Sequence, residues 1–89
     1  SIVDSKLLQW TDGKVALVEF IYAIYAGKCF NNGNTSLKDI AFCCEILFNI
    51  EIGDFYRIFL EIRNRKKSRT QFLDKLKDKI QKMMDELDR

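Results

Sequence analysis

The fold is decided by residues 11–26, which read TDGKVALVEFIYAIYA. Thr11 and Asp12 are residue types that commonly begin a helix by accepting hydrogen bonds from its first backbone N–H groups. Lys14 and Glu19 are the only charged side chains in the helical body that follows. A helix that is apolar on almost every side is stable only when other elements surround it. The sequence therefore predicts a domain centred on this helix.

Two further helices are predicted after a turn at residues 27–35, where asparagine and glycine tolerate a left-handed backbone. Ser36 is the predicted cap of the second helix. Its apolar side chains recur at the spacing of one helix face: Leu37, Ile40, Ala41, Cys44, Leu47 and Phe48. Asp54 is the predicted cap of the third helix, over about residues 55–65. Its apolar stripe is shorter: Phe55, Ile58, Phe59 and Ile62.

A fourth helix is predicted to begin at Ser68 or Thr70 and to end near residue 87. Its main apolar residues are spaced 3, 4, 3 and 4 positions apart: Leu73, Leu76, Ile80, Met83 and Leu87. Such a stripe can form a coiled-coil seam over two heptads, although a helix of this length more commonly packs on its own domain. We therefore expect the fourth helix to pack against the other three.

The composition favours a single all-α domain over residues 1–89. The chain contains no proline and only four glycines, fewer than turn-rich β folds usually need. Its 47% of hydrophobic residues can bury one small core. No apolar stretch approaches the roughly 18 residues of a membrane span, and no secretion signal is visible. We therefore expect a cytoplasmic protein without a membrane partner.

The residue types give little support to enzymatic or metal chemistry. The chain has no histidine, the commonest general base and a common zinc ligand. Its three cysteines, Cys29, Cys43 and Cys44, lack the paired spacing of metal sites. They are expected to be reduced thiols that pack as small apolar groups. We therefore expect neither an enzyme nor a bound metal or cofactor.

Charge is distributed unevenly along the chain. Residues 1–56 contain four basic and seven acidic side chains, whereas residues 57–89 contain eleven basic and six acidic ones. A basic patch occurs where Glu61 is the only acid: Arg57, Arg63, Arg65, Lys66, Lys67 and Arg69. Such a patch is either a solvated helix end and loop or a contact for phosphate or another anion. The charge pattern alone leaves both interpretations open.

Two predicted helices, at residues 36–48 and 54–65, followed by a basic segment suggest a helix-turn-helix module. Bases are usually read from the start of the second helix of such a module. In this chain that start carries Asp54, whose negative charge repels phosphate. If DNA is bound, phosphate contact through the basic segment therefore fits better than base reading from the helix start.

Four stretches of the chain carry a specific combination of motifs: WTDGKVALVEFIYAIYA (10–26), FNNG (30–33), FNIEIGDFYRIFLEIRNRK (48–66) and RTQFLDKLKDKI (69–80). Together they resemble the C-terminal region of RteC proteins, regulators of tetracycline-element excision carried by conjugative transposons of gut anaerobes. The resemblance covers nearly the whole chain. It implies a helical C-terminal domain of winged-helix type, belonging to a longer protein, that binds DNA and activates transcription of excision and transfer genes.

With this resemblance, all six residues of the basic patch become predicted DNA contacts, and double-stranded promoter DNA of the excision genes becomes the predicted partner. Arg57 could instead pair with Glu61, and Tyr56 is expected to pack beside Leu60. Trp10 is expected to be a core residue or a hydrophobic staple that covers the first helix. The sequence does not decide whether the chain forms a homodimer. The alternative function is a helical protein–protein interaction or dimerisation module whose basic end is only solvated. A winged helix also needs a β-hairpin, yet residues 63–70 show no strand-like alternation.

Overall fold

The computed structural model describes residues 7–89, and every regular element in this part of the chain is helical. The elements are α1 (Lys14–Ala26), a 3₁₀ turn η1 (Asn31–Gly33), α2 (Leu37–Phe48), α3 (Phe55–Arg63) and α4 (Gln71–Leu87). The all-α prediction is confirmed. Between residues 7 and 89 there is no strand, so the β-hairpin of a winged helix is not found in this part of the chain.

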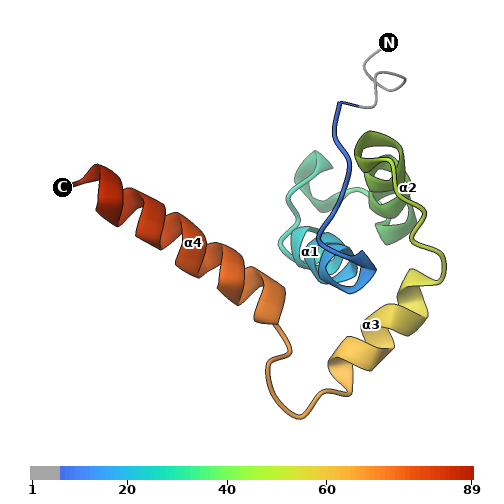
Figure 1. The fold of residues 1–89 in the computed structure, drawn as a ribbon. Coiled ribbons are helices and arrows are strands. Elements are labelled where there is room, and N and C mark those ends of the chain that lie inside the picture. Colours follow the sequence, from blue (N-terminus) through green and yellow to red (C-terminus); the bar gives the residue numbers. More distant parts are fainter. Residues whose placement is uncertain (1–6) are drawn as a thin grey trace.

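The first helix lies at the centre of the domain, as predicted. α1 packs against α2, α3 and α4, and no other pair of helices makes a comparable contact (Figure 1). The side chains of Leu17, Val18 and Ile21 are completely enclosed. Burying an aliphatic side chain of this size contributes about 1.5–3 kcal/mol, so these three residues supply much of the stability of the core.

The other helices contribute one apolar side each to this core. The buried residues outside α1 are Ile40, Ala41, Cys44, Ile52, Ile62 and Phe72. Ser36 caps α2 by accepting a hydrogen bond from the Asp39 backbone N–H at 3.0 Å. Asp54 caps α3 by accepting one from the Arg57 N–H at 3.2 Å. Both caps agree with the prediction. The side-chain oxygens of serine and aspartate accept hydrogen bonds from N–H groups that have no partner within the helix.

The start of α1 differs from the prediction. Its N-cap is Gly13 rather than Thr11 or Asp12, and no side chain caps it. Gly13 has a φ of 86°, in the left-handed region that glycine adopts without a Cβ penalty. The Trp10 indole N–H donates to the Gly13 carbonyl oxygen at 2.6 Å, which holds the chain at this bend.

Trp10 joins three helices, as expected for a core residue. Its ring lies 6.4 Å from Phe20 of α1, 5.8 Å from Phe48 of α2 and 5.7 Å from Phe72 of α4, measured between ring centroids. Its backbone N–H donates to the Phe48 carbonyl oxygen at 2.9 Å. Aromatic contacts at these separations add to the free energy of burial. Trp10 therefore acts as a structural residue that connects α2 and α4 to α1.

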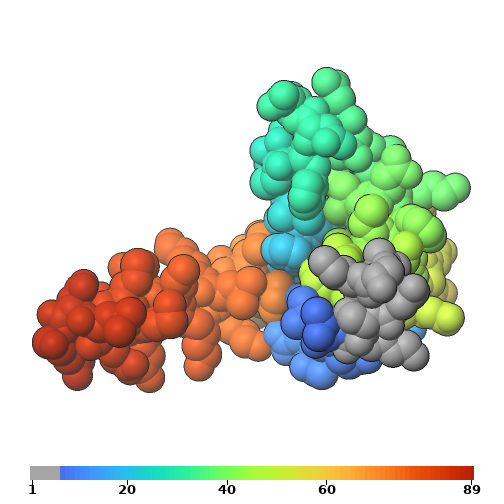
Figure 2. All heavy atoms as spheres, turned by 90° about the horizontal axis from the view of Figure 1, so that it is seen from above, coloured from blue at the N-terminus to red at the C-terminus, as the bar shows by residue number. Residues whose placement is uncertain are grey.

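The prediction that the fourth helix packs against the other three is correct only for its first turn, which contacts α1. Phe72 is the only buried residue of α4, and every residue from Asp74 onward is exposed. Figure 1 and Figure 2 show α4 projecting away from the body formed by the other three helices. The period of an amphipathic helix shows that one face is apolar but not what covers that face.

The packing of the helices does not show the predicted helix-turn-helix arrangement. α2 and α3 each pack on α1, and these contacts exceed any contact between the two. Residues 49–54 connect them in an irregular conformation. In this domain α1 therefore sets the relative positions of α2 and α3.

Candidate nucleic-acid interface

The basic segment forms a solvent-facing link between two helices. We call residues 64–70 the basic connector; it joins the end of α3 to the start of α4 at one edge of the molecule (Figure 1). Ser68 has a left-handed backbone, with a φ of 59°. The Arg65 guanidinium donates to the Ser68 carbonyl oxygen at 3.3 Å, so this side chain helps to shape the connector that carries it.

The six predicted contact residues are not equivalent. Lys66, Lys67 and Arg69 of the connector are exposed, as is Arg63 at the end of α3, whereas Arg65 is half-buried. Within residues 7–89, the ion pairs are limited to Lys75 with Asp12, at 3.1 Å. No carboxylate in the described part of the chain therefore neutralises the basic side chains of the connector, and these charges are open to an anion.

Arg57 lies apart from this group. It is six residues before Arg63 on α3, which places the two about 120° apart around the helix and about 9 Å apart along it. Arg57 also forms no ion pair with Glu61 in this structure, although both are exposed. The structure thus joins Arg63 to the connector but separates Arg57 from it.

The outer side of α3 is more exposed than expected. Tyr56 and Leu60, predicted to pack, are 58% and 49% exposed. They share one face with Arg63, since the three residues follow the i, i+4, i+7 spacing of a helix surface. The opposite side of α3 contacts the core. There the aromatic ring of Phe59 stacks on the ring of Tyr22, with 3.6 Å between the two ring centroids. A tyrosine, a leucine and an arginine are therefore presented together beside the connector.

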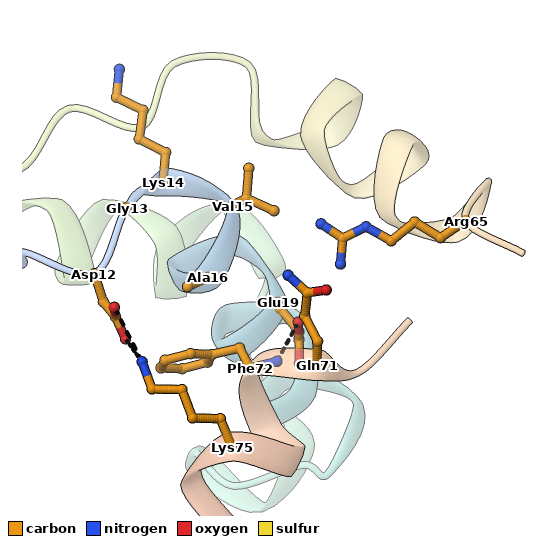
Figure 3. Close-up of a pocket in the computed structure, with 10 residues that line it drawn as sticks. All are labelled: Asp12, Gly13, Lys14, Val15, Ala16, Glu19, Arg65, Gln71, Phe72 and Lys75. Carbon is orange, nitrogen blue, oxygen red and sulfur yellow. Dashed lines mark hydrogen bonds and ion pairs between the residues drawn. The ribbon is translucent and has the colours of Figure 1, made fainter. Parts of the chain in front are cut away.

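A groove of about 600 Å³ lies between the first turn of α1, the connector and the start of α4 (Figure 3). Arg65 reaches into it from the connector, and Glu19 lines it from α1. The Glu19 carboxylate accepts hydrogen bonds from the backbone N–H groups of Phe72 at 3.2 Å and Leu73 at 2.8 Å. The groove is therefore explained by the contacts that attach α4 to the body.

Glu19 is a residue whose role sequence reasoning missed. It is only 5% exposed although it carries a charge. Thr70, the N-cap of α4, gives no side-chain cap, because its hydroxyl donates to Asp74 instead. The signal in the sequence was a single acid in an otherwise apolar helix, which requires a buried partner.

Burial changes the pKa of two groups near the core. It raises the pKa of Tyr22, with smaller effects from Tyr56 and Asp54. It also raises the pKa of Cys44 to about 11, with a smaller effect from Cys43. Cys44 is buried as expected, whereas Cys29 and Cys43 are exposed. Within the described residues, no three potential metal-ligating side chains come together.

These features define the class of protein: a small all-helical domain, organised around one central helix, with a basic surface at one edge. A family model described as RteC protein matches residues 1–88, which is nearly the whole chain. The chain belongs to the RteC family. Comparison with curated proteins and with solved structures finds no significant match. Among residues 7–89, none of the helices has the length and apolar character that crossing a bilayer requires.

Proposed function

We propose that this domain is the DNA-binding part of a transcriptional regulator that activates excision and transfer genes of a tetracycline-resistance conjugative transposon. The observation that carries the proposal is the basic connector, whose exposed cations have no carboxylate partner among residues 7–89. Membership of the RteC family supports it. Such a regulator would act in the cytoplasm, on promoter DNA of the excision genes.

In this proposal the connector binds phosphate groups of the DNA, and the outer side of α3 faces the groove of the double helix. Phosphate contacts release counterions from the DNA backbone and position the domain on the duplex without selecting a base sequence. The residues that make these contacts are Lys66, Lys67 and Arg69. Arg63 and Leu60 lie beside them on α3, and such side chains contact base edges and thymine methyl groups. The start of α3 stays away from phosphate, because it carries the negative charge of Asp54, which also accepts a hydrogen bond from the Arg57 backbone N–H.

The proposal is tested by measuring how salt changes the affinity for duplex DNA. We compare the double variant K66A/K67A with K38A/K82A, which removes the same charge from exposed lysines of α2 and α4. If both connector lysines touch phosphate, the slope of log affinity against log salt becomes shallower by about two units. Arg65 is left unchanged because its loss would also alter the connector's shape.

Fluorescence anisotropy with promoter DNA and with random-sequence duplex supplies the measurement. We expect K66A/K67A to weaken binding to both duplexes, since phosphate contacts carry no sequence information. Equal losses for both double variants would indicate diffuse charge attraction rather than a docking surface. Unchanged binding by K66A/K67A would overturn the connector's role, and absence of binding by the unmodified chain would overturn the proposed function.

A further inference from the structure

The apolar side of α4 beyond its first turn has no partner among residues 7–89. Ile80 and Met83, in the middle of the helix, are 52% and 53% exposed, and Leu76, Met84 and Leu87 are exposed as well. A 17-residue helix standing free in water is only marginally stable, because helical stability in proteins comes mostly from packing of the apolar face. We propose that this face is covered by α4 of a second copy of the chain, packed antiparallel.

The spacing of the apolar residues places them along one coiled-coil seam. Leu73, Ile80 and Leu87 occupy the a positions of a heptad, and Leu76 and Met83 occupy the d positions. The residues that flank such a seam, at e and g, decide which orientation two helices adopt. In α4 the flanking residues beyond the first turn are Lys77, Lys79, Met84 and Glu86.

The flanking charges favour the antiparallel orientation. In a parallel pair, g residues meet e residues of the other helix, so Lys79 would meet Met84 and gain no opposite charge. In an antiparallel pair with Ile80 opposite Met83, g meets g, and Lys79 lies beside Glu86 of the second copy. Two-fold symmetry makes this contact twice. On the other flank, the stem of Lys77 covers Met84, as long basic side chains cover apolar surface.

The same charges select one register. Sliding the antiparallel helices by one heptad in one direction brings Lys79 beside Lys79 and Lys77 beside Lys77 of the second copy. Sliding them in the other direction brings Glu86 beside Glu86, and like charges at these positions repel. A parallel pair would also bring the two basic connectors to the same end of the seam. In the favoured register, the two bodies lie at opposite ends, so their connectors do not repel each other strongly.

This arrangement has a consequence for DNA, which rests on the proposed function. With Ile80 opposite Met83, the Thr70 residues that end the two connectors lie about 35 Å apart along the helix axis, given a rise of 1.5 Å per residue. Half-sites separated by one turn of the double helix are about 34–36 Å apart. The dimer would therefore place the inner ends of its two connectors at about the spacing of one DNA turn.

Sedimentation equilibrium of the 89-residue chain without DNA tests the dimer independently of its DNA binding. We expect the unmodified chain to pass from monomer to dimer as its concentration rises, and K79E and E86K each to weaken the dimer roughly tenfold, because each replaces two attractive contacts by two repulsive ones. The double variant K79E/E86K restores opposite charges and should recover the original association.

Matched controls separate this interface from general charge effects. K82E changes the same charge at a position away from the seam and should leave association unchanged, whereas I80E should abolish it. Thermal melting followed by circular dichroism checks that the body formed by α1, α2 and α3 stays folded in every variant, since none of these residues belongs to its core. A monomer at every concentration overturns the dimer, and failure of K79E/E86K to recover association overturns the antiparallel register. If the unmodified chain dimerises but does not bind DNA, only the proposed function is overturned.

Discussion

The carboxylate of Glu19 accepts a hydrogen bond from the backbone N–H of Leu73 at 2.8 Å, 54 residues further along the chain. A second bond, from the Phe72 N–H at 3.2 Å, uses its other oxygen. A buried acid of the central helix thus caps the first turn of α4. The negative charge also lies at the end of α4 where the helix dipole is positive, which stabilises both groups.

Replacement of Glu19 should therefore destabilise the domain measurably. Glu19→Gln removes the charge and leaves one acceptor oxygen for two N–H groups, so we expect a loss of about 1–2 kcal/mol in the free energy of unfolding. Thr70→Ala is the matched control, because Thr70 occupies the N-cap position without capping. Urea denaturation measures both. A loss for Thr70→Ala as large as that for Glu19→Gln would contradict the assignment.

The position of Ile21 predicts strong sensitivity to substitution. Its side chain is completely enclosed where α1 meets the other helices. Ile21→Val removes one methylene and should cost about 0.5–1.5 kcal/mol. Ile21→Asp buries a charge without a partner, and we expect it to abolish folding. Leu60→Ala, on the exposed side of α3, should change stability little. Thermal melting followed by circular dichroism compares the three variants, and a parent-like melt of Ile21→Asp would show that α1 is not central.

Tyr22 and Phe59 should be energetically coupled. Their rings are stacked with an interplanar angle of 5° and link α1 to α3. Aromatic pairs contribute about 0.5–1.5 kcal/mol beyond the area they bury. A double-mutant cycle with Tyr22→Leu and Phe59→Leu should give a coupling energy in this range. Repeating the cycle with the exposed Tyr25 in place of Tyr22 should give additive losses. Additivity for the stacked pair itself would argue against a direct contribution from the stack.

The three thiols should react at different rates. Cys29 and Cys43 are exposed, whereas Cys44 is 7% exposed and burial raises its pKa to about 11. Because the thiolate is the reactive form, an alkylating reagent should label two cysteines in the native chain and three after denaturation. Mass spectrometry after a timed reaction counts the labels. Three labels appearing at equal rates in the native state would mean that Cys44 is accessible.

The same pKa shift predicts a loss of stability in alkaline solution. The Cys44 thiol ionises near pH 9 when unfolded and only near pH 11 when folded, so the unfolded state gives up its proton first. Below pH 9 both states are protonated and the contribution of Cys44 is fully present; it decreases as the pH rises from about 9 to 11. Urea midpoints for the parent and for Cys44→Ala should therefore converge over this interval. A constant difference between them would contradict the shift.

Much of the local structure could be predicted from the sequence. The central position of α1 follows from its apolar surface, and the starts of α2 and α3 follow from Ser36 and Asp54, because these features act within one or two helical turns. The exposure of the connector's lysines also follows from the absence of apolar residues there. These predictions needed no knowledge of which segments meet in space.

The positions of the helices relative to one another depend on long-range contacts. The apolar stripe of α4 is the same whether that helix lies on its own domain or projects from it, so periodicity could not show that Ile80 is exposed. The capping of α4 by Glu19 joins residues more than 50 positions apart, and local patterns do not encode such a contact. The separation of Arg57 from the connector likewise depends on helix geometry. Local sequence patterns specify which segments are helices and which charges are present, because they act over one or two helical turns. Long-range packing on α1 sets which surfaces remain open for a partner.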